Sequence, residues 1–415
     1  MLKWWNRQQL YFRVLVGITI GLIVGFTFGE SAQWLMKPIG TAFLRLLFFL
    51  VTPLTLFTLV SGITKMESAK SLASMGGKLI LYYAITSVIA VFMSFAISLA
   101  INPGAEGAGL LGGAAAGEKA EFSFIENAIK WIPTNPFEAL ATGNILQVVF
   151  FSVFLGCVLL ILGERAKTVT KLFDEGCEIM LTITGYIMSL APYGIMGLTS
   201  DMVSSLSGKM FAEVGKFLLA DWVSILAVVF ILYPIQLKVL ANINPIKFFK
   251  AITPAMLIAA STTSSSAALP VSLDVAAKNL RISESIYGFG LTVGSTINSN
   301  GMTCVLAAIC VFAANLYGMT LTLPMILQFG ILAVMLSMGT GGVKGGGIVL
   351  STVLLQSMGL PLELVPILAA IWPIGDIAHT SGNVVGDLVG VTIISAREND
   401  MDVEGFNHNF VSERV

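Results

Sequence analysis

The chain has 415 residues, of which 56% carry apolar side chains and only 11% are charged. Soluble domains average about one-quarter charged residues, so this composition excludes a cytosolic enzyme, a nucleic-acid-binding protein and a disordered scaffold. The 23 basic and 24 acidic residues nearly cancel, so no overall field attracts a polyanion. We therefore expect an all-α polytopic membrane protein whose surroundings are the lipid bilayer.

Six continuous apolar runs each approach the roughly 20 helical residues that cross a bilayer. They lie at 10–30, 39–63, 78–101, 138–163, 175–199 and 214–241. A polar, glycine-rich connection separates the third run from the fourth, at 102–135. No small-residue cleavage site follows the first run, so we expect that run to be retained as a span.

Basic residues gather after the second, fourth and sixth runs. They are Lys65, Lys70, Lys78, Arg165, Lys167, Lys171, Lys238, Lys247 and Lys250. Because lysine and arginine concentrate in cytoplasmic loops, this distribution predicts cytoplasmic termini in a plasma-membrane protein, the inner membrane where there are two. The segment after residue 395 is acidic and aperiodic, which predicts a disordered cytoplasmic tail.

Small polar residues interrupt the apolar segments after residue 250, at 261–266, 298–301 and 339–347. Irregular backbone at membrane depth is tolerated only where it lines a cavity or binds something, and such breaks mark transporter sites. The arms within 251–279 and 323–358 are each too short to cross twice. The pattern favours two re-entrant helical hairpins with the Ser and Gly tracts at their tips; two kinked spanning helices are the alternative.

Charged residues inside the apolar segments are few: Arg45, Asp221, Lys344, Asp376 and Asp387. Each costs about 2.5–3.5 kcal/mol at a helix centre on the insertion scale, so each needs a reason to be there. Arg45 and Asp221 are solitary, and we interpret them as an interface anchor and an interior hydrogen-bonding group.

The last apolar segment carries a polar stripe. Asp376, Thr380, Asn383 and Asp387 are 4, 3 and 4 residues apart, so they share one helix face, and His379 flanks it. Such a stripe predicts a polar interior site; a network that only fixes helix packing is the alternative. For His379, a structural role, a ligand contact and a proton-carrying role all remain open.

These residues resemble the dicarboxylate/amino-acid:cation symporter family, the glutamate transporters and their prokaryotic homologues. The likeness runs from about residue 10 to 395. The matching motifs lie at 43–47, 51–54, 133–140, 263–266, 269–270, 294–298 and 383–387.

The resemblance implies a secondary active transporter rather than an enzyme, built as a homotrimer. It implies eight transmembrane helices plus two re-entrant hairpins in an elevator fold, where a transport domain slides against a scaffold. The implied segments are scaffold helices 1 and 2 at 1–77, helix 3 of the transport domain with an extracellular loop at 78–137, scaffold helices 4 and 5 at 138–210, helix 6 of the transport domain at 211–245, the transport-domain core at 246–396 and a cytoplasmic tail at 397–415.

The resemblance also implies binding residues. The substrate would contact Ser264, Ser265, Ser266, Val343, Asp376, His379, Thr380 and Asn383, with Asp376 at the α-amino group. One sodium site would use Gly294, Asn298, Asn383 and Asp387, a second Tyr83, Thr86 and Ser87, and a third Thr296, Ser299, Ser337, Met338 and Thr340. Oxygen ligands with one carboxylate suit a hard cation.

Four positions depart from the family pattern. Asn300 stands where the family commonly has an aspartate that helps hold sodium, and His379 replaces the arginine that captures a side-chain carboxylate. Thr263 and Lys344 stand where relatives have arginine and proline. The site is therefore more positive than usual, so we expect fewer coupling ions: one or two Na⁺, or H⁺, with Lys344 either substituting for a cation or solvated at the hairpin tip.

Substrate preference follows from the same residues. Asp376 favours an ammonium-bearing substrate, and without the arginine clamp a small neutral or polar amino acid is favoured. An acidic amino acid is the second choice, since a charged His379 or Lys344 would pair with its second carboxylate, and a plain dicarboxylate is the third. An anion channel and an intramembrane hydrolase that uses the serine tract with His379 or Asp376 are remote alternatives.

Overall fold

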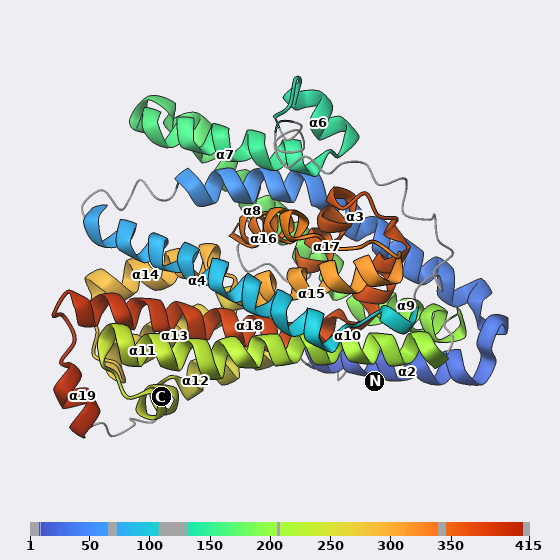
Figure 1. Cartoon of the computed structure of the whole chain (residues 1–415). Coiled ribbons are helices and arrows are strands. Elements are labelled where there is room, and N and C mark those ends of the chain that lie inside the picture. Colours follow the sequence, from blue (N-terminus) through green and yellow to red (C-terminus); the bar gives the residue numbers. More distant parts are fainter. Residues whose placement is uncertain are drawn as a thin grey trace.

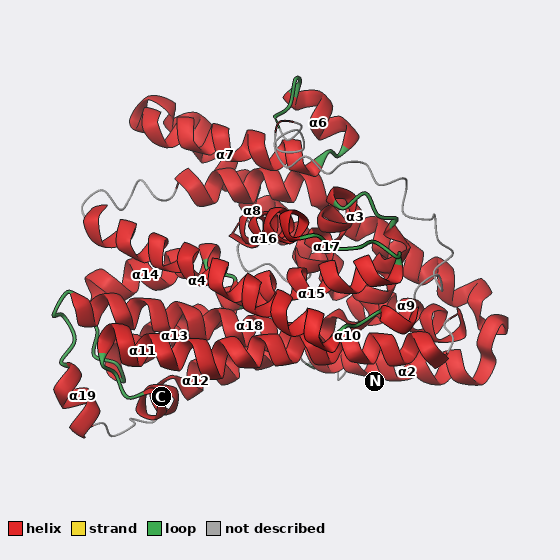
Figure 2. Cartoon of the chain, viewed as in Figure 1, coloured by secondary structure: helices red, strands yellow, loops and turns green. Residues whose placement is uncertain are grey.

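The computed structural model describes residues 8, 10–64, 73–107, 129, 132–205, 208–338 and 346–409. Every regular element in these ranges is a helix, which confirms the all-α prediction (Figure 2). The first half contains α2 (Leu10–Phe28), α3 (Gln33–Thr64), α4 (Ala73–Ile101), α6 (Pro136–Thr142), α7 (Ile145–Leu162), α8 (Lys167–Ser189) and α9 (Ala191–Ser205). The second half contains α10 (Gly208–Ala227), a π-helical turn (Val228–Leu232), α11 (Tyr233–Ala241), α12 (Pro245–Thr262), α13 (Ser265–Lys278), α14 (Glu284–Ile297), α15 (Asn300–Leu316), α16 (Leu323–Met338), α17 (Gly346–Ser357), α18 (Val365–Arg397) and α19 (Val403–Asn409). Short 3₁₀ turns lie at Gly29–Ala32, Ala105–Gly107, Gly163–Ala166 and Leu362–Leu364.

Five stretches of the described residues are long and apolar enough to cross a membrane. They are Phe12–Ser61, Gly77–Ile101, Gly208–Ala241, Ile286–Leu316 and Leu362–Arg397. The first of these is divided by a 3₁₀ turn into α2 and α3. Two shorter apolar helices, α16 and α17, follow the pattern expected for hairpin arms.

The fourth and fifth predicted runs are each broken in the structure. Gly143 adopts a left-handed conformation (φ +69°) that ends α6, and the Asn144 side chain accepts a hydrogen bond from the Gln147 N–H at the start of α7. The helix of the fifth run begins at Lys167, before the predicted start, and is interrupted at Leu190. A hydrophobicity profile alone does not show these breaks, because capping residues act at single positions.

A first group of helices packs around α3 and α9. α2 and α3 both lie along α9, and α7 and α8 lie along α3 (Figure 1). Gly17, Gly21 and Gly25 follow one another every fourth residue on the face of α2 that meets α9, where a methyl group on any of them would lie within 3 Å of α9. Small residues at this spacing let two helix backbones approach closely.

A second group surrounds α18. Figure 1 shows α10, α11, α12 and α13 running beside it, and α14 and α15 also pack on it. α15 is apolar on every side and buried along nearly its whole length, as a central helix should be. α18 therefore lies where several elements can contribute side chains to one site.

Two pairs of neighbouring helices lie where the sequence predicts hairpins. α12 and α13 pack against each other and are joined at Thr263, whose φ of +47° makes the turn, next to the serine tract. α16 and α17 also pack together, and their connection at 339–345 lies outside the described residues.

The prediction of a disordered tail after residue 395 is wrong for its first part. α18 continues to Arg397, and α19 docks with Phe406 buried. The Asn407 amide donates to the Asn242 carbonyl oxygen (2.8 Å) and accepts from the Asn244 N–H (2.8 Å). The contacts of this short helix come from single residues, such as one aromatic side chain and one amide, and these give no periodic signal in the sequence.

Candidate substrate and cation site

The predicted polar stripe lies on one continuous helix, α18. His379, Thr380, Asn383 and Asp387 are all buried, and Asp376 is half-buried. Burial of so many polar groups on one face confirms that the stripe points into the protein, as the spacing predicts.

Asp387, Asn298 and Asn383 form a compact cluster. The Asn298 amide donates to Asp387 Oδ1 (2.8 Å) and to the Asn383 carbonyl oxygen (3.2 Å). Gly294 lies against the same carboxylate, since a methyl group there would be 2.9 Å from Asp387 Oδ1. All four residues of the first predicted cation set are thus brought together.

One oxygen of this cluster lacks a donor. Asn298 Oδ1 is buried, and within the described part of the chain no donor reaches it. Asn298 lies in the break between α14 and α15, with extended backbone (φ −88°, ψ 97°). A buried acceptor beside a carboxylate fits a hard cation, which is held by oxygen atoms.

The second predicted cation set connects to the first through hydrogen bonds. The Tyr83 hydroxyl donates to the Asp387 carbonyl oxygen (3.1 Å). Ser87 donates to Asn300 Oδ1 (2.7 Å), and Thr86 accepts from the Gln236 amide (3.1 Å). α4, α11, α15 and α18 therefore share one buried network.

Tyr233 completes this network, although no sequence pattern selects it. The Asn300 amide donates to the Tyr233 hydroxyl oxygen (2.9 Å), and the Tyr233 hydroxyl donates to the Gly382 carbonyl oxygen (3.3 Å). The Asn300 side chain thus uses both its donor and its acceptor on protein partners. A tyrosine in an apolar run carries no sequence signal for such a role.

The third predicted cation set is only partly described. The Thr303 hydroxyl donates to the Ser299 carbonyl oxygen (3.0 Å) and shares a hydrogen bond with the Ser337 hydroxyl (2.7 Å). Ser299 and Ser337 therefore meet through Thr303, which sequence analysis did not select. Met338 is half-buried at the end of α16, while the Thr296 side chain and residues Thr340, Val343 and Lys344 lie outside the described residues.

The serine tract occupies the turn between α12 and α13. The Ser264 hydroxyl accepts a hydrogen bond from the Ala267 N–H (3.3 Å) and so caps α13. Ser265 is buried and Ser266 is exposed. Both arms of the hairpin pack on α18, so the tract and the stripe belong to the same helix group.

His379 has a partner that sequence analysis did not assign to it. His379 Nε2 lies 3.0 and 2.9 Å from the two carboxylate oxygens of Asp221 on α10. Both side chains are about 1% exposed. Two isolated charges in separate spans are a signal for such a pair, but helix order alone does not show that α10 and α18 are neighbours.

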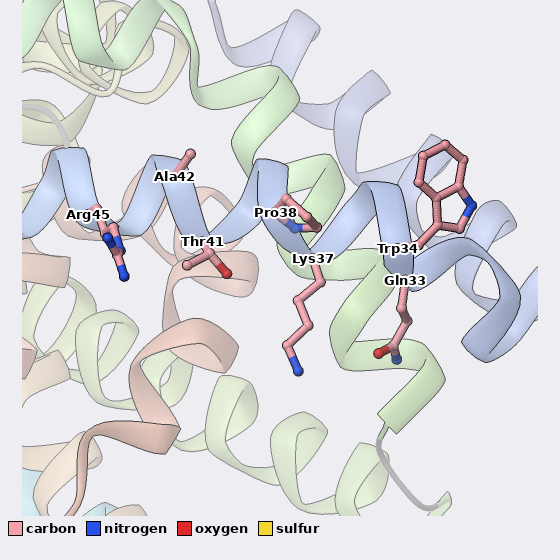
Figure 3. A pocket seen from close by; sticks show the side chains of 7 residues that line it. All are labelled: Gln33, Trp34, Lys37, Pro38, Thr41, Ala42 and Arg45. Atoms are coloured by element: carbon pink, nitrogen blue, oxygen red, sulfur yellow. The ribbon is translucent and has the colours of Figure 1, made fainter.

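Arg45 contributes to a separate feature, a surface cavity of about 590 Å³ on α3. Gln33, Lys37, Thr41 and Arg45 point to one side of the helix there (Figure 3). Among the described residues, none from α18 or from either hairpin lines this cavity, so the cavity is distinct from the candidate site.

Comparison with known proteins agrees with this architecture. The profile of the sodium:dicarboxylate symporter family matches residues 10–397. The chain is 29% identical over 405 residues to a proton/sodium-glutamate symport protein of Bacillus caldotenax, covering 95% of this chain and 96% of that one. It is 29% identical over 406 residues to a C4-dicarboxylate transport protein of Geobacter sp. strain M21 (95% and 92% covered) and 26% identical over 401 residues to a proton/glutamate-aspartate symporter of Bacillus subtilis (94% and 95% covered). With helices that suit a multi-pass membrane protein and a profile match over nearly the whole chain, the protein belongs to the sodium:dicarboxylate symporter family.

Proposed function

We propose that this protein is a cation-coupled amino-acid symporter whose cation and substrate bind along α18. The observation that carries the proposal is the buried Asp387 carboxylate beside Asn298, whose side-chain oxygen has no donor among the described residues. A carboxylate and an unsatisfied carbonyl oxygen in a low-dielectric site are costly until a cation joins them.

The proposed cation is Na⁺ or H⁺. Na⁺ would be held at Asp387, Asn298, Asn383 and Gly294, where carboxylate and carbonyl oxygens meet. Asn300 supplies a neutral amide that already bonds to Ser87 and Tyr233. A carboxylate at this position would require a positive ion near the second set of residues, and the amide has less need of one. We therefore propose fewer than three coupling ions, with Lys344 taking the place of one of them.

The proposed substrate is a small neutral or polar amino acid. Asp376 would neutralise its ammonium, Thr380 and Asn383 would contact the same end, and the serine tract and Val343 would complete the site. An acidic amino acid or a dicarboxylate is the second candidate, and the names of the relatives, which specify glutamate, aspartate and C4-dicarboxylates, favour it.

The proposed mechanism follows the two packing groups. α2, α3, α7, α8 and α9 would form a fixed scaffold within a homotrimer, and α4 with α10 to α18 would slide as the transport domain, with both termini cytoplasmic. The scaffold helices expose large apolar side chains, such as Ile161, Leu172, Ile179 and Tyr186, which lipid or neighbouring protomers would cover.

Transport in proteoliposomes tests the proposal. Uptake of labelled serine and aspartate is measured with and without sodium, at several pH values. We expect uptake that depends on one of the two cations with a coupling ratio of one or two. Strict dependence on three sodium ions would overturn the reduced coupling, and uptake independent of both cations would overturn symport.

A further inference from the structure

We propose that Asp221 sets the substrate class of the site by holding His379 and cancelling its charge. The site then takes an amino acid whose side chain bears a hydroxyl or a carboxamide, and it excludes acidic substrates. This inference rests on the proposed function above, because it requires the substrate to bind along the stripe of α18.

The contact between the two side chains fixes the orientation of the imidazole. Both Asp221 oxygens lie within 3.0 Å of His379 Nε2, and a carboxylate can only accept hydrogen bonds. Nε2 therefore carries a proton. The carboxylate of Asp221 thus fixes the tautomer and the ring position of His379. It influences a bound ligand through this histidine rather than by direct contact.

The charge of the pair argues against a second substrate carboxylate. The Asp221–His379 pair is neutral when the imidazole is protonated and carries one negative charge when it is not, so in neither state is it a net cation. The pair therefore offers no net positive charge to the extra carboxylate of aspartate, which would have to be buried beside it without a counter-charge from the pair.

Two unsatisfied atoms next to this pair point to the side chain that does bind. His379 Nδ1 is buried and has no hydrogen-bond partner among the residues that the structure describes, and the same holds for Trp372 Nε1 on the same face of α18. The two rings lie 5.4 Å apart between centroids. A hydroxyl or carboxamide both donates and accepts, so it satisfies Nδ1 in either protonation state and can accept from the indole N–H.

Gly375 makes room for the arrangement. A methyl group at this position would lie 2.9 Å from Asp221 Oδ2 and 2.9 Å from His379 Cε1. The glycine lies inside α18, where alanine would otherwise be the better helix former. Its presence is explained by the close approach of Asp221 to the helix backbone.

The test is a competition experiment on the full-length protein in proteoliposomes. Uptake of labelled serine is inhibited with unlabelled serine, threonine, asparagine, alanine, aspartate and succinate. The selectivity ratio is the half-inhibitory concentration of aspartate divided by that of serine. In the wild type we expect a ratio of about 30 or more, since one uncompensated charge in a site of intermediate dielectric changes affinity by that order.

Three variants separate charge from structure. Asp221→Asn keeps the shape and the acceptor but removes the charge, so the ratio should fall about tenfold or more. Asp221→Glu restores the charge, and its ratio should stay within about threefold of the wild type. Ser224→Ala is the matched control: it lies one turn along α10, its buried hydroxyl donates to the Ala220 carbonyl oxygen (2.7 Å), and its ratio should not change.

Each outcome decides the proposal. A wild type that takes aspartate as well as serine overturns it, as does an unchanged ratio in a transporting Asp221→Asn variant. If Asp221→Asn cannot be purified folded, Gly375→Ala decides instead: a lower ratio supports the proposal and an unchanged ratio overturns it. A wild type that transports no amino acid at all contradicts the proposed function rather than this inference.

Discussion

At the scale of single residues, the cluster at Asp387 combines strong binding groups with incomplete hydrogen bonding. Asn298 uses its donor on the carboxylate and leaves its acceptor unsatisfied. Buried polar groups are almost always paired, so an orphan oxygen beside a carboxylate indicates a site completed by a bound species. The neighbouring Asn300 shows the opposite case, since its side chain both accepts and donates a hydrogen bond.

The first prediction concerns the Asp387 carboxylate. Asp387→Asn removes the charge but keeps the shape, so the sodium concentration for half-maximal thermal stabilisation should rise about tenfold or more. The matched control is Thr392→Val, which lies on the same helix and loses a buried hydroxyl that bonds only the Leu388 carbonyl oxygen. Equal sodium responses in Asp387→Asn and the wild type would rule out a cation at this cluster.

The second prediction concerns the satisfied amide at residue 300. Asn300→Asp introduces a buried charge and removes the donor to the Tyr233 hydroxyl. Without a cation this should destabilise the protein by several kcal/mol, on the order of the cost of an unpaired buried charge. Melting curves at increasing sodium concentration should then show a steeper dependence than in the wild type; an unchanged dependence would mean that residue 300 does not face a cation site.

At the scale of elements, the breaks between helices are more important for the candidate site than the helices themselves. Asn298 and Ser299 separate α14 from α15, and Asn298 bonds to Asn383 and Asp387 of α18. Thr263 and Ser264 separate α12 from α13, and both of these helices pack on α18. These interruptions follow from local chemistry that a sequence displays: clusters of Ser, Asn and Gly within apolar runs.

The third prediction tests how α17 seats on α18. A methyl group on Gly347 would lie 1.9 Å from the Trp372 ring, so Gly347→Ala should prevent α17 from seating and lower uptake about tenfold or more. Gly215→Ala, in α10 with nothing within 4 Å, should leave uptake and folding intact. Full activity of Gly347→Ala, measured beside that control, would show that this contact is not needed for transport.

The fourth prediction is a pH effect on the docked C-terminal segment. Partial burial raises the pKa of the Asp400 carboxyl, but the hydrogen bonds that it accepts from Ser283 and Ser395 outweigh this and hold its pKa below the ordinary value. A lowered folded-state pKa means that the stabilisation is complete above about pH 4 and is lost as the pH falls through the folded-state pKa.

Asp400→Asn should mimic that loss at neutral pH. Amide hydrogen exchange in α19 should quicken about two- to fivefold, as expected for an exposed interaction of modest strength. Asp402→Asn is the comparison, since Asp402 accepts from the Gly405 N–H within the segment, whereas Asp400 accepts from Ser283, just before α14. Exchange that is unaffected by Asp400→Asn would show that Asp400 does not hold the segment in place.

At the scale of the whole molecule, much of the architecture follows from the sequence. The apolar runs predict the helices, the small polar tracts predict the turn of the first hairpin, and the 4-3-4 spacing predicts the buried face of α18. Asp221 was expected to be an interior hydrogen-bonding group, but its pairing with His379 and the role of Tyr233 were missed because they depend on which helices become neighbours, which no local pattern shows. The breaks at Gly143 and Leu190 were missed because hydrophobicity averages over single capping positions.

The central claim is that a cation gradient drives the substrate through this protein. Proteoliposomes are loaded with equal labelled serine on both sides, and a sodium gradient and then a proton gradient are imposed. We predict net accumulation of serine above its starting concentration under one of these gradients, and its absence in Asp387→Asn. A wild type that only equilibrates serine, or that passes anion current without accumulating an amino acid, would contradict the account.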